Sequence, residues 1–510
     1  MEKVKKGKPL MIQGTHSDAG KSMIATAFCR IFKEDGYQTA PFKSQNMALN
    51  SYITMDGKEI GRAQGIQAEA AGVEATTNMN PILIKPTRDH ESQIVVHGKP
   101  LRNMFAFQYR QEFFNEGLNV ITAAYKELAN HYDRIVIEGA GSPAEVNLND
   151  RELVNMRVAK IAQAPVVLVG DIDKGGVFAS LVGTLQLLPD EHKPRVIGVL
   201  INKFRGDLEL LKPGLKWFEE YTGVPVLGVI PYMHDVEIDA EDSLSLRNYS
   251  TLVNPLKEID IAVISYPRIS NFTDIDPLSI EEDCHVRLVT KPSQLGTPDL
   301  IVLPGSKNTI EDAQFLQESG LALAINQVLN TTNVHVIGIC GGYQMLGETI
   351  TDPDAVESRI ESIKGLGLLP VETVMTTSKK TERVSGYVQL ESEKVSIEGY
   401  EIHMGKTVSK STTEAFAVVE HEKEGTVKDN VIGTYVHDVF HNDALRRALL
   451  NQIRKHKKLP PITDTFNSRL QKEESFSKAA AYVREAVDME KLYHLIDSYK
   501  SPEQAQKYSL

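Results

Sequence analysis

Short apolar runs, many of them rich in β-branched residues, recur through the first half of the chain. Each run ends in a turn rich in glycine or aspartate, and a stretch of helical character follows it. Near-continuous apolar runs suit strands that are covered on both faces, and their alternation with helices favours a parallel α/β sheet. Functional side chains are then expected just beyond the carboxyl ends of the strands. The runs are 9–14, 133–142, 164–173, 194–204 and 225–232.

A second series of the same kind begins near residue 259, after a polar stretch without a strong period. From about residue 446 the chain is charged and helical, and its amphipathic end is typical of a helix that packs against a domain. We therefore predict an α/β protein of two three-layer domains with mainly parallel sheets. The predicted parts are domains at 1–240 and 259–445, a linker at 241–258 and a helical C-terminal extension at 446–510.

Composition narrows the class of protein and its partners. The chain of 510 residues is longer than a single domain with one hydrophobic core usually is. Of its residues, 41% are hydrophobic and 24% charged, as in globular proteins. The net charge of -12 argues against nucleic-acid binding, which favours a basic face. Only three widely spaced cysteines, no signal-peptide core and no apolar run of about 20 residues predict a cytoplasmic protein with no membrane partner.

The segment "GTHSDAGKS" follows the first apolar run and precedes a helical stretch, as a phosphate-binding loop does. It has one residue more between its glycines than the common G-x-x-x-x-G-K-[ST] loop. The lysine can pair with the β- and γ-phosphates of ATP, and the serine can ligate magnesium. The predicted ATP-binding residues of this loop are Gly14, Thr15, Gly20, Lys21 and Ser22.

Further polar residues follow the other predicted strands of the first domain. Glu138 and Asp171 are candidate magnesium ligands with Ser22, and the Asn202 amide is a candidate for the adenine edge. A short loop at 41–51 crowds a lysine with amides, and such a cation can neutralise a substrate carboxylate or the transferred phosphoryl group. The predicted contacts to substrate or phosphoryl group are Lys43, Gln45, Asn46, Asp173 and Lys174.

A cysteine in the second domain has the surroundings of a nucleophile. Cys340 lies in "GICGG" between a predicted strand and a helix, the arrangement of a nucleophile elbow. The helix N-terminus favours the thiolate, and the backbone N–H of Gly341 can stabilise an oxyanion, with a second donor near Gly305. His437, at the end of a later strand, is the predicted base.

These motifs resemble two known families. The stretched loop is similar to that of dethiobiotin synthetase and its relatives, which activate carboxylates with ATP; partition-type ATPases carry an extra loop lysine that is missing here. The elbow resembles class I glutamine amidotransferases, which release ammonia from glutamine through a cysteine thioester. Those enzymes commonly have His-x-Glu, whereas Val439 stands at the glutamate position here. Glu401 or His403 is a candidate to assist His437 instead.

An ATP-dependent synthetase domain joined to a glutaminase domain implies amide synthesis. The motifs at 41–51, 138–148, 170–180, 201–207, 303–309 and 399–405 together resemble the corrin-amidating members of this two-domain family. The resemblance implies a small-molecule corrin substrate whose peripheral carboxylates are amidated, with ATP, Mg²⁺ and glutamine consumed. Amidation of another carboxylate, in an earlier corrin or a cell-wall intermediate, and a partition-type ATPase switch are the alternatives. Homo-oligomer formation stays open.

Overall fold

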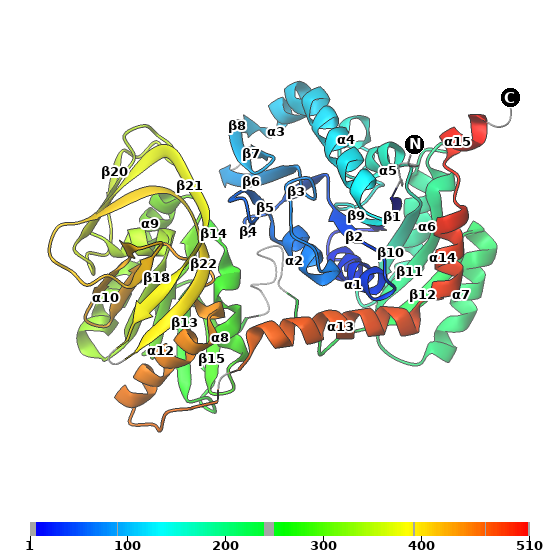
Figure 1. Cartoon of the computed structure of the whole chain (residues 1–510). Coiled ribbons are helices and arrows are strands. Elements are labelled where there is room, and N and C mark those ends of the chain that lie inside the picture. Colours follow the sequence, from blue (N-terminus) through cyan, green and yellow to red (C-terminus); the bar gives the residue numbers. More distant parts are fainter. Residues whose placement is uncertain (1–6, 89, 239–248, 391–392, 465, 508–510) are drawn as a thin grey trace.

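The computed structural model describes residues 7–88, 90–238, 249–390, 393–464 and 466–507. Two α/β units lie side by side, and the C-terminal helices run from the second unit back to the first (Figure 1). This arrangement confirms the predicted α/β class with mainly parallel sheets. Part of the predicted linker lies outside the described residues, and the predicted boundary at 445/446 falls within a helix, α12 (Asp443–His456).

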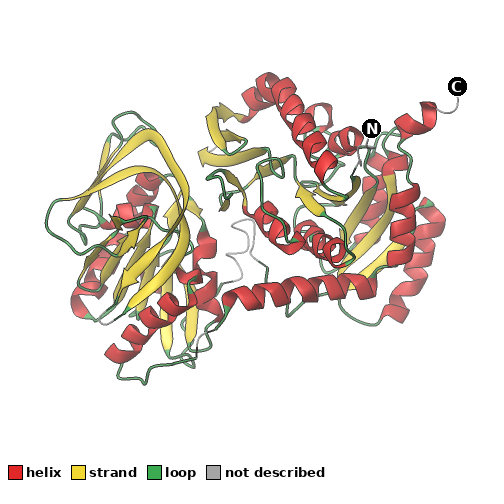
Figure 2. Ribbon diagram, viewed as in Figure 1, coloured by secondary structure: helices red, strands yellow, loops and turns green. Residues whose placement is uncertain are grey.

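A six-stranded parallel sheet in the order β12-β11-β10-β1-β9-β2 forms the centre of the first unit. Alternate residues of each strand face opposite sides, so Met11 joins one apolar cluster while Leu10 and Ile12 join the other. Helices cover both faces, which explains the near-continuous apolar runs (Figure 2). The strands are β1 (Lys8–Gly14), β2 (Thr39–Phe42), β9 (Arg134–Glu138), β10 (Val166–Asp171), β11 (Val196–Phe204) and β12 (Val226–Pro231).

The two helical layers of this unit draw on different parts of the chain. One apolar cluster joins the sheet to α1 (Lys21–Glu34), α2 (Arg62–Ala71), α13 (Ser468–Ala486) and α14 (Met489–Ser498). The other joins it to α4 (Phe114–His131), α5 (Met156–Ala162), α6 (Val177–Leu187) and α7 (Leu208–Thr222). The C-terminal extension therefore completes the first unit. The remaining helices of this unit are α3 (Ala106–Gln108) and α15 (Pro502–Lys507).

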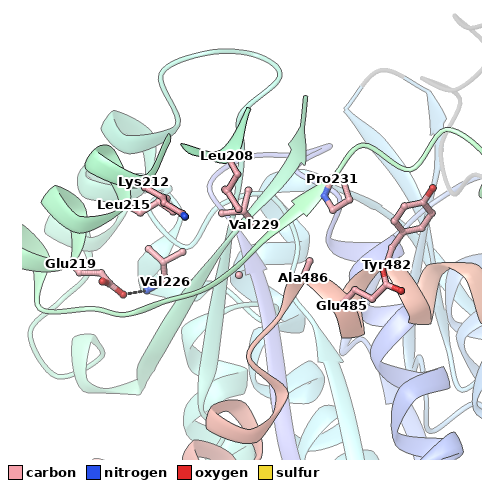
Figure 3. A pocket seen from close by; sticks show the side chains of 11 residues that line it. Leu208, Lys212, Leu215, Glu219, Val226, Val229, Pro231, Tyr482, Glu485 and Ala486 are labelled. Carbon is pink, nitrogen blue, oxygen red and sulfur yellow. Dashed lines mark hydrogen bonds between the residues drawn. The ribbon is translucent and has the colours of Figure 1, made fainter. Parts of the chain in front are cut away.

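The sheet's outer strand, β12, borders an open groove of about 560 Å³ (Figure 3). Side chains from α7 and α13 form its walls, and Glu219 accepts a hydrogen bond from the Val226 N–H at 2.8 Å. None of the predicted site residues lines this groove.

Smaller β-elements project from the first unit toward the second (Figure 1). The segment 45–47, predicted as a loop, instead forms a strand that pairs in parallel with β6. The partner strand lies more than 30 residues later in the chain, and such a parallel pairing leaves no signal in the local sequence. The apolar pattern therefore does not predict this strand. These strands are β3 (Gln45–Met47), β6 (Ile82–Arg88), β7 (Glu91–Val96) and β8 (Lys99–Phe105), and a separate hairpin is formed by β4 (Ser51–Ile53) and β5 (Glu59–Gly61).

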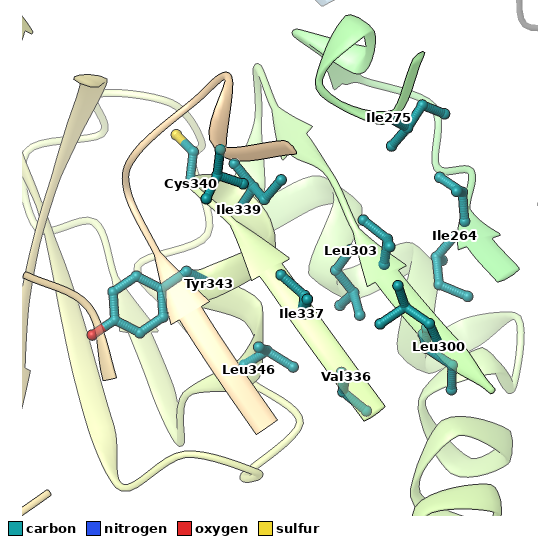
Figure 4. Packing of buried hydrophobic residues seen from close by; sticks show 14 of the residues in the cluster. Ile264, Ile275, Leu300, Leu303, Val336, Ile337, Ile339, Cys340, Tyr343 and Leu346 are labelled. Carbon is teal, nitrogen blue, oxygen red and sulfur yellow. The ribbon is translucent and has the colours of Figure 1, made fainter. Parts of the chain in front are cut away.

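The second unit is built on another six-stranded sheet, in the order β15-β13-β16-β18-β26-β25, with only β25 antiparallel. One large apolar cluster joins this sheet to its helices (Figure 4). The strands are β13 (Ile259–Ile264), β15 (Cys284–Val289), β16 (Leu300–Leu303), β18 (His335–Ile339), β25 (Thr426–Lys428) and β26 (Val431–Thr434). The helices are α8 (Asp276–Ile280), α9 (Thr309–Glu318), α10 (Leu321–Thr331), α11 (Gly341–Leu346) and α12.

A long antiparallel pair, β21 (Val371–Gln389) and β22 (Lys394–Ser409), dominates a further sheet of the second unit. Figure 1 shows this pair curving over the sheet that carries the cysteine. The shorter strands of the unit are β14 (Ile269–Ser270), β17 (Gly305–Ser306), β19 (Thr349–Thr351), β20 (Ser362–Lys364), β23 (Ala417–Val419) and β24 (Glu422–Glu424). Among the described helices, none has the length and apolar character of a membrane-crossing segment.

Candidate active sites

The phosphate-type loop lies between β1 and α1, as the sequence predicts. Gly20 has a left-handed φ of 95°, and a Cβ built on it would lie 2.1 Å from Asn202 Nδ2, so only glycine fits there. Lys21 curls back over the loop, and its Nζ donates to the carbonyl oxygens of His16 at 2.9 Å and Gly141 at 3.2 Å. Gly14 lies beneath this lysine. The free N–H groups that begin α1 follow directly, which is a phosphate-binding geometry.

Glu138 is the centre of the charged network beside this loop. Its buried carboxylate accepts hydrogen bonds from Ser22 at 2.8 Å, Lys43 at 2.9 Å and Gln67 at 2.6 Å. Burial alone would raise the pKa of Glu138, but the Lys43 charge and the three donors outweigh it and hold the pKa below its usual value. The cavity above, about 460 Å³, is lined by Lys21, Ser22 and Lys43 among others.

The donor set here suits a magnesium ion that arrives with phosphates. No group of three His, Cys, Asp or Glu side chains with metal-binding geometry occurs among the described residues. Magnesium bound with a nucleotide takes one or two protein oxygens and completes its shell with phosphate and water. The Ser22 hydroxyl and the Glu138 carboxylate, in mutual contact at the mouth of the loop, fit that requirement.

Asp171, the third predicted metal ligand, has other partners. One of its oxygens accepts from Lys203 Nζ at 2.8 Å, and the other accepts from the Asp173 N–H at 2.9 Å. Lys203 also donates to the Asp18 carbonyl in the phosphate loop, at 2.6 Å. Asp171 therefore holds a lysine against the loop. The sequence reasoning missed Lys203, although it is the residue after the predicted Asn202.

Of the predicted contacts to substrate or phosphoryl group, Lys43 and Asn46 line this cavity and the other three do not. Asn46 lines the cavity and donates to Gln64 at 2.9 Å, whereas Gln45 accepts from the Tyr109 hydroxyl. Lys174 is an exposed residue 3.8 Å from Asp18, and Asp173 pairs with Arg205 at 3.5 Å.

The Asn202 side chain binds the backbone of the phosphate loop. Its Nδ2 donates to the Ala19 carbonyl at 3.0 Å, and the residue is buried. The adenine contact expected of it stays a prediction. The loop's Thr15 hydroxyl is buried and has no hydrogen-bond partner among the described residues, so it remains available to a bound phosphate.

Cys340 occupies the sharp turn between β18 and α11, as the elbow motif predicts (Figure 4). Its φ of 51° and ψ of −106° form a strained backbone conformation for a residue with a side chain, as expected for a nucleophile elbow. A Cβ on Gly342 would lie 1.9 Å from the Leu303 carbonyl, so the turn can pack against β16 only with glycine there. The Cys340 thiol lies 3.6 Å from the Ile402 carbonyl.

His437 is held by Asp274, a residue that the sequence reasoning did not select. His437 Nδ1 lies 2.7 Å from Asp274 Oδ2, and both side chains are fully buried. The second Asp274 oxygen accepts from the Asp438 N–H, also at 2.7 Å. Burial alone would lower the pKa of His437, but the Asp274 carboxylate and contact with Cys340 raise it to about 10. His437, the predicted base, thus lies between Asp274 and Cys340, the predicted nucleophile.

The residues proposed to assist His437 have different partners. Glu401 pairs with His403 at 3.1 Å and with Lys380 at 2.7 Å, on a separate cavity of about 990 Å³. Asp274 contacts His437 instead, because the fold brings its 3₁₀ turn (Phe272–Ile275) beside the imidazole. The predicted oxyanion loop also reaches this site: a Cβ on Gly305 would lie 3.2 Å from His437 Cε1, and one on Gly341 would lie 2.8 Å from the Ser306 nitrogen.

Comparison with known proteins identifies both units. Residues 10–246 match the model of the CobQ/CobB/MinD/ParA nucleotide binding domain. Residues 260–445 match the model of the CobB/CobQ-like glutamine amidotransferase domain. A nucleotide-binding domain joined to a glutamine amidotransferase domain defines an ATP-dependent, amide-forming glutamine amidotransferase, and this chain is such an enzyme.

Relatives along the whole chain specify the family. Cobyric acid synthase of Geobacillus sp. (strain WCH70) is 62% identical over 96% of this chain and 97% of its own. Cobyric acid synthase of Anoxybacillus flavithermus is 61% identical over 94% and 95%, and that of Streptococcus sanguinis is 49% identical over 96% and 99%. The chain belongs to the cobyric acid synthase family, glutamine amidotransferases of cobalamin synthesis.

Proposed function

We propose that this enzyme amidates the b, d, e and g carboxylates of adenosylcobyrinic acid a,c-diamide, through acyl phosphates that react with ammonia from glutamine. The observation that carries the proposal is the presence of two separate candidate sites in one chain. One is a phosphate loop with a carboxylate–lysine cluster, and the other is a cysteine–histidine–aspartate series. The choice of corrin rests on the family, and the mechanism rests on the residues of the two sites.

In the synthetase site, the N–H groups of the loop, Lys21 and the Thr15 hydroxyl would hold the ATP phosphates. Mg²⁺, bound by Ser22 and Glu138, would neutralise phosphate charge. Lys43 lies beside Glu138 at the cavity and would face the carboxylate that attacks the γ-phosphorus. The new bond joins carboxylate oxygen to phosphorus while the bond to ADP breaks, which leaves an acyl phosphate.

In the glutaminase site, Cys340 Sγ would attack the glutamine amide carbon. His437, held by Asp274, would take up the thiol proton and donate a proton to the departing ammonia. The N–H groups near Gly341 and Ser306 would stabilise the oxyanion. Collapse to a thioester releases ammonia, and water then frees glutamate. Ammonia attacks the acyl carbon, loses a proton and expels phosphate, so each amide costs one ATP and one glutamine.

The experiment is mass spectrometry of a corrin a,c-diamide incubated with enzyme, ATP, Mg²⁺ and glutamine. We expect four successive amidations. A product series that stops earlier, or no mass change, would contradict the proposed substrate.

Two cysteine variants separate the nitrogen source from the synthetase. Cys340→Ala should lose amidation with glutamine and keep it with free ammonia. Cys284→Ala is the matched control, because this thiol is buried in β15 of the same domain and should leave glutamine use unchanged. Glutamine-dependent amidation by Cys340→Ala would show that another group releases the ammonia.

A further inference from the structure

The β4–β5 hairpin of the synthetase unit contacts the glutaminase base. The Ser51 N–H in β4 donates to Asn271 Oδ1 at 2.9 Å, and Asn271 Nδ2 lies 3.5 Å from His437 Nε2. The Asn50 side chain fixes the same turn, because its Oδ1 accepts from the Phe272 N–H at 3.2 Å. Since His437 Nδ1 faces Asp274, its Nε2 is the nitrogen left for the thiol. Asn271 therefore lies between the hairpin and the reactive edge of the imidazole.

The same hairpin also packs behind the cysteine. Ile53 forms a small buried cluster with Tyr400 and Ile402 of β22. The Tyr400 ring stacks on the His437 imidazole with centroids 5.0 Å apart, and the two residues exchange backbone hydrogen bonds. The Ile402 carbonyl is the one that lies 3.6 Å from Cys340 Sγ. One strand of the synthetase unit thus supports the neighbours of both glutaminase residues.

Two segments connect this contact to the nucleotide site. The stretch that ends at Ser51 begins near Lys43, whose Nζ binds Glu138. Helix α2 binds Glu138 through Gln67, and at its first residue Arg62 approaches Asp438, next to His437, at 3.4 Å. Both segments start at the predicted magnesium carboxylate and end beside the glutaminase base. A rigid helix and a hydrogen-bonded loop are suited to transmit a small displacement.

We propose that the β4–β5 hairpin and α2 position His437 through Asn271 and Asp438, so that glutamine hydrolysis depends on how Glu138 is held in the nucleotide site. The inference rests on the proposed function, since it couples the two half-reactions. Asn271 acts as a positioning residue: its side-chain amide lies against the His437 imidazole and sets the orientation of that ring. When nucleotide changes the donors around Glu138, Lys43 and Gln67 carry that change toward the interface.

Asn271→Gly tests the positioning role without nucleotide. Asn271 has a φ of 50°, so glycine keeps the backbone conformation while removing the amide. The measurement is the rate of Cys340 alkylation by iodoacetamide across pH. We expect alkylation and glutamine hydrolysis to slow by about tenfold or more, with an altered pH profile, because a misplaced base loses its alignment. Ammonia-dependent amidation should be unchanged, which also shows that the variant folds.

Arg88→Ala is the matched interface control. Arg88 also crosses the interface, to the Glu357 carbonyl at 2.9 Å and to Glu311 at 3.3 Å, but it does not join the Asn271 contact. It should leave alkylation at the wild-type rate. Equal rates in wild type and Asn271→Gly, or an equal loss in Arg88→Ala, would overturn the positioning role.

Two variants in the synthetase unit test the coupling. Asn50→Ala should slow Cys340 alkylation although it lies in the other unit. Arg62→Gln should reduce the difference in glutamine hydrolysis with and without ATP and Mg²⁺. Full nucleotide dependence in Arg62→Gln, with normal alkylation in Asn50→Ala, would overturn the coupling. If ammonia-dependent amidation of the corrin is itself absent in the wild type, the proposed function fails instead, so the two failures are distinguishable.

Discussion

The charge on His437 depends on one carboxylate. A fully buried imidazole would ordinarily lose its proton easily, yet Asp274 at 2.7 Å reverses that effect and raises the pKa of His437 to about 10. The folded pKa exceeds the unfolded value, so this pairing stabilises the fold fully below about pH 6.5 and less as pH rises toward 10.

Asp274→Asn should therefore change both activity and pH dependence. We expect glutamine hydrolysis to fall by about 10²–10⁴-fold, because the imidazole loses its charge partner and its orientation. The stability difference from wild type should be largest below about pH 6.5 and shrink toward pH 10. Steady-state kinetics and calorimetric unfolding across pH measure the two effects.

Asp276→Asn is the control for that experiment. Asp276 lies two residues away and accepts a hydrogen bond from Tyr249 at 2.8 Å. It should change glutamine hydrolysis by no more than about twofold. A wild-type rate in Asp274→Asn would mean that His437 needs no acid partner.

A second buried group, the Asp312 carboxyl in α9, also makes the fold less stable as pH rises, but in a lower pH range. Burial raises its pKa to about 7, although Ser306 and the Arg268 N–H donate to it. The folded state then binds more protons than the unfolded chain, so the wild type loses stability as pH rises from about 4 through 7. The pKa difference corresponds to an upper value of roughly 4 kcal/mol.

Asp312→Asn should remove that dependence, because the amide oxygen can accept from the Arg268 N–H and the amide nitrogen can donate to the Ser306 hydroxyl, without a charge. The melting temperature of the variant, measured by differential scanning calorimetry, should rise relative to that of the wild type as pH increases from 5 to 8. If the melting temperatures of the two proteins change in parallel across this pH range, the pKa of Asp312 is not raised by burial.

The chemistry-bearing residues were predictable where a local motif carries them. Cys340 and Lys21 stand in short glycine patterns whose geometry the fold reproduces. Asp274 had no such signal, because it is 163 residues from His437 in sequence and comes from a 3₁₀ turn without a periodic pattern. Only the assembled fold brings the acid to its base.

At the scale of elements, apolar runs predicted the central strands of both sheets, because strands buried on both faces have a strong local signature. The long pair β21–β22 escaped prediction, since its burial alternates irregularly and its edges carry many polar residues. The C-terminal helices were expected as an extension that packs on a domain, but sequence gave no indication of which domain receives them.

Helix α13 provides a test of that packing. Phe476 is fully buried against α1 and the first sheet, so Phe476→Ala should destabilise the first unit by about 3–5 kcal/mol. The only tryptophan, Trp217, lies in α7 of the same unit, and its fluorescence reports on unfolding by denaturant. Lys478→Ala, half-exposed on the same helix, should change stability by no more than about 0.5 kcal/mol. An equally small effect of Phe476→Ala would mean that α13 adds little to the core.

At the scale of the whole molecule, the two units share charged residues that neither would bury alone. Glu59 of the β4–β5 hairpin is fully buried between Lys85 of its own unit and Lys379 of β21. Burial alone would raise the pKa of Glu59, but the two lysines outweigh it and hold the pKa far below its usual value. Such an interface could not be predicted from sequence, because each lysine looks like an ordinary surface residue in its own segment.

Glu59→Gln should uncouple the units by leaving two buried ammonium groups without a counter-charge. We expect a loss of about 3–5 kcal/mol in the free energy of unfolding at neutral pH. The difference from wild type should shrink as pH falls below about 4.5, because the unfolded chain then binds a proton at Glu59 that the folded state releases, and it should vanish only once the pH also falls below the lowered pKa of the folded state. Glu220→Gln, which breaks an exposed pair with Lys216, should cost almost nothing. Because β4 also supports Asn271, slower Cys340 alkylation should accompany the loss of stability; if stability falls while alkylation stays normal, the charge cluster holds the units together without setting the glutaminase site.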